Sequence, residues 1–106
     1  MIITSVDEYY LNSNYWNWNG YKISWNVKGE ESNDPIILLH GFGACSAHWR
    51  KNINFFVKKG YLVYSIDLLG FGKSDQPGIG QVGALDNGVW CDQVSDFIME
   101  IKILIV

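Results

Sequence analysis

Two short, uninterrupted apolar runs separated by an amphipathic segment constrain the fold of this chain more than any other feature. The first run covers 35–40 and the second covers 61–67. Such runs are typical of strands that are buried on both faces of a parallel sheet. Between them, apolar residues recur at helical spacing over 46–59, and Lys58, Lys59 and Gly60 provide a helix stop. The sequence therefore predicts a strand–helix–strand unit with a right-handed crossover, and an α/β fold.

A β-hairpin is predicted ahead of this unit, over 15–28. Asn19 and Gly20 lie between two runs of alternating residues, and both tolerate the positive φ of a two-residue turn. Counting outward from the turn sets Trp18 opposite Tyr21, so the aromatic side chains of both strands share one face, which is more typical of a core than of a ligand platform. The opposite face is predicted to be exposed to water and consists of Asn17, Lys22, Ser24 and Asn26.

The second half of the chain predicts a loop, a helix and the start of a further strand. Glycine-rich residues 68–88 follow the strand 61–67 and are expected to lack regular structure. Apolar residues then recur at helical spacing from Trp90 to Ile101, which predicts an amphipathic helix over 89–101. The β-branched run 102–106 is expected to begin another buried strand, parallel to 36–39.

Composition and charge exclude several classes of function. The chain is 48% apolar and 18% charged with a formal net charge of −3, which describes a globular protein without a basic surface for nucleic acid. No stretch approaches the roughly 20 apolar residues of a membrane span, so a cytoplasmic location is expected. Cys45 and Cys91 have the spacing of neither a disulfide framework nor a metal site, and no metal or organic cofactor is expected.

The loops after the two apolar runs carry the most specific motifs. The first is His40-Gly41-Phe42-Gly43, and the second runs from Asp67 through Gly70 and Gly72 to Ser74 and Asp75. In order and spacing, this sequence resembles the α/β-hydrolase family. Trp49 and the stretch 90–94 also resemble the cyanobacterial and plastid members, near the pheophytinase-like and haloperoxidase-like branches.

The resemblance implies a sheet in which the hairpin, 61–67 and 36–40 are neighbours in that order, the last two parallel. It also implies an oxyanion loop, in which the Phe42 backbone N–H stabilises the negative charge that acyl transfer builds on a carbonyl oxygen. His40 is then expected to be a buried hydrogen-bonding group and not the catalytic base. The other motif residues would shape the loops: Gly41, Gly43, Asp67, Gly70, Gly72 and Ser74.

The nucleophile expected of such a family is missing from the pattern. None of the eight serines lies in G-x-S-x-G, and Cys45 and Asp86, which have small neighbours, do not directly follow a predicted strand. We therefore interpret residues 1–106 as a partial, amino-terminal α/β-hydrolase domain with a hairpin (15–28), an oxyanion-loop strand and helix (35–59), a strand and glycine-rich loop (61–88) and a helix (89–101). Such a fragment should be inactive alone. Only a complete relative would cleave an ester or similar bond of a small apolar substrate.

Two alternatives remain open from the residues alone. Gly41-x-Gly43-x-x-Ser46 with Asp67 at the end of the next strand imitates a dinucleotide fingerprint, although Ser46 replaces its third glycine. The stretch 67–74 also imitates a P-loop, but this interpretation is rejected, because Asp67 replaces the first glycine and its carboxylate would repel a phosphate. A second class of function is therefore a small non-catalytic binding module, for a dinucleotide or for a protein partner at the aromatic hairpin.

Overall fold

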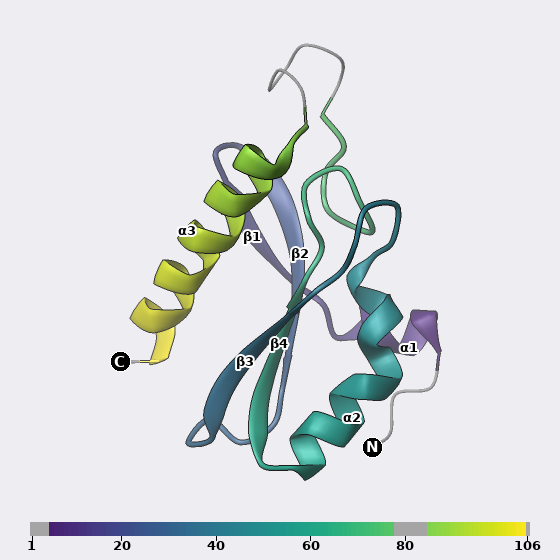
Figure 1. The fold of residues 1–106 in the computed structure, drawn as a ribbon, viewed down its shortest axis with the longest axis vertical. Coiled ribbons are helices and arrows are strands. Elements are labelled where there is room, and N and C mark those ends of the chain that lie inside the picture. Colours follow the sequence, from purple (N-terminus) through teal and green to yellow (C-terminus); the bar gives the residue numbers. More distant parts are fainter. Residues whose placement is uncertain (1–4, 78–84, 106) are drawn as a thin grey trace.

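In the computed structural model, a mixed four-stranded sheet lies between two groups of helices (Figure 1). The structure describes residues 5–77 and 85–105, with side chains up to Lys102. One face of the sheet is covered by α3, and the other by α1 and α2 (Figure 1). In chain order the elements are α1 (Val6–Leu11), β1 (Asn14–Trp18), β2 (Tyr21–Lys28), β3 (Asp34–Leu39), the 3₁₀ helix η1 (Ser46–Trp49), α2 (Arg50–Lys58), β4 (Tyr61–Ile66) and α3 (Asn87–Ile105).

The hairpin of β1 and β2 forms at the predicted turn. Asn19 and Gly20 have φ values of 51° and 85°, and positive φ at both central positions is what a type I′ turn requires. Trp18 pairs with Tyr21, which confirms the predicted register. The Asn17 side-chain oxygen also accepts a hydrogen bond from the Gly20 N–H at 3.0 Å, which tightens the turn.

The strand order β1-β2-β4-β3 confirms the predicted α/β arrangement. β2 and β4 are antiparallel, whereas β3 and β4 are parallel, with Ile36 opposite Val63. The segment between β3 and β4 is helical as predicted, with η1 as its first turn, and Gly60 ends it at a φ of 94°. The carboxyl ends of β3 and β4 therefore lie at the same edge of the sheet.

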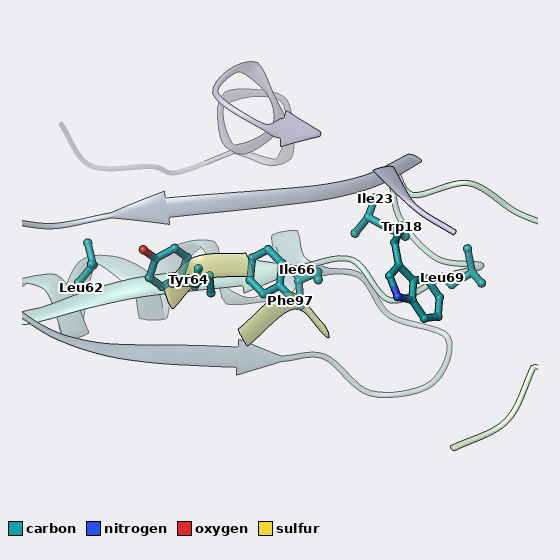
Figure 2. Packing of buried hydrophobic residues seen from close by; sticks show 8 residues of the cluster. Trp18, Ile23, Leu62, Tyr64, Ile66, Leu69 and Phe97 are labelled. Carbon is teal, nitrogen blue, oxygen red and sulfur yellow. The ribbon is translucent and has the colours of Figure 1, made fainter. Parts of the chain in front are cut away.

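The larger hydrophobic cluster lies between the sheet and α3. Phe97 of α3 is 1% exposed and packs with Tyr64 and Ile66 of β4 (Figure 2). The rings of Trp16 and Trp25 lie 5.5 and 5.6 Å from the Phe97 ring. The aromatic side of the hairpin is thus core. We call this side of the sheet the apolar face.

The opposite side of the hairpin corrects a sequence prediction. Asn17 and Lys22 are exposed as expected, but Ser24 and Asn26 are buried. Two elements that were not expected on this side cover them: α1 lies over Asn26, and the loop 67–75 reaches Ser24, whose N–H donates to Ser74 Oγ. α1 places the Tyr9 carbonyl oxygen where it accepts a hydrogen bond from the Asn26 side-chain nitrogen at 2.9 Å. We call the side of the sheet under α1 and α2 the hydrogen-bonded face.

The predicted burial of the first apolar run was also wrong, because β3 is an edge strand. Ile36, Ile37 and Leu38 are half-buried, and Leu39 is 44% exposed. The prediction that 102–106 forms a strand beside it is wrong for 102–105, which continue α3, and Val106 lies outside the described residues. No glycine or proline separates this run from the preceding helix, and its side chains do not forbid one.

Helix α3 also begins two residues earlier than the predicted start at residue 89. The Asp86 side chain accepts a hydrogen bond from the Val89 N–H at 3.0 Å, as N-terminal capping residues do. Of the glycine-rich loop, residues 78–84 lie outside the described residues. Among the residues that are described, no helix has the length and apolar character to cross a membrane.

Candidate functional site

The loops that follow β3 and β4 meet at the carboxyl edge of the sheet, and His40 joins them. The Leu68 N–H donates to His40 Nε2 at 3.0 Å, so this nitrogen is the acceptor and the ring proton lies on Nδ1. Nδ1 then donates to the Gly41 carbonyl oxygen at 2.8 Å. His40 is 5% exposed. With both ring nitrogens engaged, His40 holds the loops together.

Phe42 lies at the tip of a tight turn directly after His40. The Ala44 N–H donates to the Gly41 carbonyl oxygen at 3.1 Å, and Gly43 has a φ of 78° while φ of Phe42 is not positive. This combination defines a type II turn with Phe42 at its second position. The Phe42 side chain is 86% exposed. Within the described part of the chain, its backbone N–H donates no hydrogen bond and can serve a ligand.

Asp67, directly after β4, is a completely buried carboxylate that organises both loops. Oδ1 accepts a hydrogen bond from the Ser46 N–H at 2.7 Å, and Oδ2 accepts one from the Lys73 N–H at 3.0 Å. The Tyr10 hydroxyl donates to the same carboxylate, at 3.0 Å to Oδ2 and 3.2 Å to Oδ1. Burial, with Cys45 and Asp67 adding to it, raises the pKa of the Tyr10 hydroxyl above its ordinary value, so Tyr10 stays a donor.

The glycine-rich loop 67–75 folds closely around this carboxylate. Gly72 has a φ of 57°, and a Cβ there would overlap the Asp67 side chain, so only glycine fits. The Gly70 N–H closes the loop onto the Asp75 carbonyl oxygen at 2.9 Å. Ser74 Oγ donates to the Asp67 carbonyl oxygen at 2.8 Å and accepts from the Ser24 N–H at 2.9 Å, which ties the loop to β2.

Two residues of α3 hold the same loop, and sequence reasoning assigned them no role in it. Gln93 is completely buried, and its side chain accepts from the Leu69 N–H at 2.8 Å and donates to the Asp67 carbonyl oxygen at 3.1 Å. Trp90 Nε1 donates to the Leu69 carbonyl oxygen at 3.0 Å. The sequence pattern predicted Gln93 on the polar side of this helix, and its complete burial corrects that prediction. Its spacing, three residues after Trp90 and four before Phe97, is the signal that could have pointed to this contact.

A pocket of about 540 Å³ opens beside the Phe42 turn, between the end of β3 and α3. Phe42, Phe71 and Trp90 stand around it as an aromatic group, with ring centroids 5.4 to 6.3 Å apart. Of the described residues that line it, none carries a formal charge at neutral pH, counting His40 as neutral. The lining residues are Leu39, His40, Gly41, Phe42, Leu68, Phe71, Asn87, Trp90, Cys91, Val94, Ser95 and Ile98.

The geometry does not favour a phosphate at this edge of the sheet. In a dinucleotide-binding fold, the first N–H groups of the helix bind the pyrophosphate. Here the Ser46 N–H at the start of η1 donates to the Asp67 carboxylate, and a phosphate at that place would meet negative charge. Among the described residues, no three His, Cys, Asp or Glu side chains lie together as a metal site requires. Cys45 is a free thiol whose extended backbone precedes η1.

Comparisons with known proteins agree on one family. The family model described as alpha/beta hydrolase fold matches residues 34–98. Protein ABHD8 of Homo sapiens is 36% identical over 52 residues, which is 49% of this chain and 12% of that protein. Epoxide hydrolase 3 of Xenopus tropicalis is 37% identical over 59 residues, 56% of this chain and 16% of that protein.

Solved structures are similar to this chain over more residues than the family model matches. An esterase from Exiguobacterium antarcticum superposes with a TM-score of 0.71 at 27% identity, over 83% of this chain and 31% of that one. The chain thus spans less than a third of the length of the relatives it matches. The matched residues 34–98 include both loops of the site. This chain belongs to the α/β-hydrolase family and covers part of its full-length fold.

Proposed function

We propose that this chain supplies the oxyanion-loop part of a hydrolase that cleaves an ester or similar bond in a small apolar molecule. The observation that supports this most is the type II turn at Gly41–Ala44. It presents the Phe42 N–H at the carboxyl end of β3, at the rim of an uncharged pocket. When a nucleophile adds to an ester carbonyl, negative charge develops on the oxygen, and a fixed N–H stabilises it without reorganisation.

The pocket supports an apolar substrate. Its volume of about 540 Å³ lies within the range of small-molecule sites, and its polar groups are few. Phe42, Phe71 and Trp90 offer ring faces and edges to a neutral group. A charged substrate would lose its hydration there without gaining a partner of opposite charge. The esterase and epoxide hydrolase relatives are consistent with a neutral substrate.

The nucleophile and its acid and base partners must come from polypeptide outside these 106 residues. No serine here stands in G-x-S-x-G. Cys45 directly precedes η1 and does not follow a strand directly, and His40 has both nitrogens engaged within the loops. The chain alone should therefore hydrolyse p-nitrophenyl butyrate no faster than its heat-denatured form. Saturable hydrolysis by the chain alone would contradict this part of the proposal.

The oxyanion role can be tested by pairing the chain with the remaining part of the Exiguobacterium esterase, co-expressed as a second chain. Phe42→Pro removes the N–H but suits the second position of a type II turn, whereas Phe42→Ala keeps the N–H and removes the ring. We expect the proline variant to lower kcat/KM about 10²- to 10³-fold, as loss of an oxyanion donor does, and the alanine variant to lower it much less. Equal losses in an active pair would contradict the oxyanion role.

If the two chains do not associate, a binding measurement on the chain alone tests the proposed site. Butyranilide is an uncleavable analogue of the ester and can be titrated into the ¹⁵N-labelled chain. The expected result is saturable shifts of the Phe42 and Gly43 amides and of the Trp90 indole N–H. Shifts confined to the hairpin, or none at all, would contradict the proposed site.

A further inference from the structure

Helix α1 precedes the segment that the family model matches, yet it contacts the candidate site at two points, Ser46 and Asp67. The family match begins at residue 34, whereas α1 covers Val6–Leu11. The helix begins with a capping box, in which the Ser5 side chain accepts from the Glu8 N–H at 3.1 Å. Its next two residues, Tyr9 and Tyr10, point toward the start of η1. Their rings meet edge to face with centroids 5.0 Å apart.

Tyr10 reaches the loop through Asp67. Its hydroxyl donates to both carboxylate oxygens, and Oδ1 in turn accepts the Ser46 N–H. A buried carboxylate is stable only while donors surround it. Among the described donors to Asp67, the Ser46 and Lys73 groups belong to the backbone. The Tyr10 hydroxyl is therefore the donor that a side-chain substitution can remove without altering the main chain. The orientation of the carboxylate toward Ser46 thus depends on Tyr10.

Tyr9 contacts Ser46 as well, through the Ser46 side chain. The Tyr9 hydroxyl lies 2.7 Å from Ser46 Oγ, to which it donates, and 2.5 Å from Ser65 Oγ in β4. Tyr9 is 1% exposed, and Ser46 and Ser65 are completely buried. Both tyrosines of α1 therefore converge on Ser46, one on its hydroxyl and the other on its N–H through Asp67.

Ser46 is one of the two ends of the candidate oxyanion loop. At the other end, His40 is fixed by the Leu68 N–H. Gly41, Phe42 and Gly43, between the two ends, are exposed. A short exposed loop keeps a defined shape only while its ends are held, because it has few contacts of its own. The position of the Phe42 N–H is then set jointly by the loop after β4, through Leu68, and by α1.

We propose that α1 is a strap for the oxyanion loop and that Tyr10 is a positioning residue, which acts on the Phe42 N–H through Asp67 and Ser46. The proposal rests on the proposed function for its chemical meaning. Its structural content concerns the chain alone. Tyr10→Phe keeps the ring against Tyr9 and removes only the hydroxyl, so it separates the hydrogen bond from packing.

Amide hydrogen exchange and chemical shifts of the full ¹⁵N-labelled chain test the strap. In Tyr10→Phe we expect the Ser46 and Lys73 amides to exchange about tenfold faster and the Phe42 and Gly43 amides to shift. Amides of β4 should keep their exchange rates within twofold. Tyr15→Phe, the same change at a half-exposed tyrosine of β1, is the matched control and should leave the loop amides unchanged. Unchanged loop amides in Tyr10→Phe, or an equal acceleration throughout β4, would overturn the proposal.

The paired esterase adds a readout that separates the two proposals. Tyr10→Phe should lower kcat at least fivefold with KM within twofold, because the substrate pocket is intact while the N–H is misplaced. If the pair is active and Tyr10→Phe matches wild type in kcat, the strap is refuted. If the exchange pattern is as expected but Phe42→Pro and Phe42→Ala are equally active, the oxyanion function fails and the strap remains.

Discussion

The two faces of the sheet are built from the same strands, and each carries a hydrophobic cluster. They differ in the buried hydrogen bonds that the face under α1 and α2 adds to this packing. On the apolar face, side chains of β4 such as Tyr64 and Ile66 pack against Phe97 of α3. On the hydrogen-bonded face, β4 contributes Ser65, and Asp67 directly follows the strand, with the polar atoms of both bonded to α1. Successive residues of a strand point to opposite faces, so one short segment serves both.

This difference shows which contacts fix the positions of the loops at the candidate site. Apolar burial is non-directional and roughly proportional to area, so α3 gains most of its stabilisation from covering the sheet. Hydrogen bonds require specific distances and angles, and a buried polar atom without a partner costs free energy. The loops of the candidate site are attached mainly through the second kind of contact. Apolar packing on both faces supplies stability. Hydrogen bonds supply position, those of the hydrogen-bonded face together with those of Gln93 and Trp90 from α3.

The largest expected loss of stability comes from removing a buried ring from the apolar face. Phe97→Ala removes a ring that is 1% exposed and in contact with the rings of Trp16, Trp25 and Tyr64. We expect the free energy of unfolding to fall by about 3–5 kcal/mol, as for other buried phenylalanines, measured by urea denaturation. Met99→Ala on the exposed side of α3 is the control and should cost less than about 0.5 kcal/mol. A loss equal to that of Met99→Ala would contradict the assignment of Phe97 to the core.

The second prediction concerns the Asp67 carboxylate, which accepts several hydrogen bonds on the hydrogen-bonded face. Asp67→Ala leaves the Ser46 and Lys73 N–H groups and the Tyr10 hydroxyl without their acceptor. We expect a loss of about 2–4 kcal/mol, because each buried unpaired donor costs about 1–3 kcal/mol and some will find water. Asp92→Ala, at an exposed position of α3, is the matched control. A variant as stable as this control would show that the carboxylate does not organise the loops.

The apolar half of the fold could be predicted because its signals are local. The Asn19–Gly20 turn sets the hairpin register, and the spacing from Trp90 to Ile101 marks the buried side of α3. The sequence did not reveal where α3 ends, because nothing in 102–105 distinguishes a helix from a strand without a neighbouring strand to pair with. The motif residues His40, Phe42 and Asp67 could be placed at the sheet edge from their position after predicted strands.

The hydrogen-bonded face could not be predicted in the same way. Ser24 and Asn26 alternate with apolar residues as water-facing residues do. Only the elements that cover them, the loop 67–75 at Ser24 and α1 at Asn26, distinguish the two cases. The contact of Tyr10 with Asp67 joins residues 57 apart, and that of Gln93 with Asp67 joins residues 26 apart. No short-range pattern encodes such pairs. The capping box of Ser5 and Glu8 was the one local signal that a helix lies in this region.

Alkaline pH should weaken the hydrogen-bonded face through α1. Burial raises the pKa values of Tyr9 and Tyr10 above the ordinary value of 10. A raised pKa means that the folded state retains protons that the unfolded state loses, so the contribution is complete below pH 10 and declines as pH rises above it. The slope is up to about 1.4 kcal/mol per pH unit for each tyrosine. Urea denaturation between pH 9 and 11 measures it.

Substitution by phenylalanine assigns this pH dependence to a residue. Tyr10→Phe should make the decline of the free energy of unfolding with pH less steep, by up to the share of one proton, about 1.4 kcal/mol per pH unit. Tyr15→Phe, at the half-exposed position on β1, is the control for the loss of a hydroxyl. A slope that is the same in wild type and Tyr10→Phe would show that the hydroxyl is not buried beside Asp67.

The smallest effects come from two buried serines that differ only in their partners. Ser74 Oγ accepts from the Ser24 N–H and donates to the Asp67 carbonyl oxygen, whereas Ser24 Oγ has no hydrogen-bond partner among the described residues. Ser74→Ala should cost about 1–2 kcal/mol, since it leaves the Ser24 N–H unpaired. Ser24→Ala should change stability by less than about 0.5 kcal/mol, or raise it, because it removes an unpaired hydroxyl. Urea denaturation compares the two variants. Equal losses would mean that the Ser24 hydroxyl is also bonded, and that the hydrogen-bonded face extends under the middle of β2.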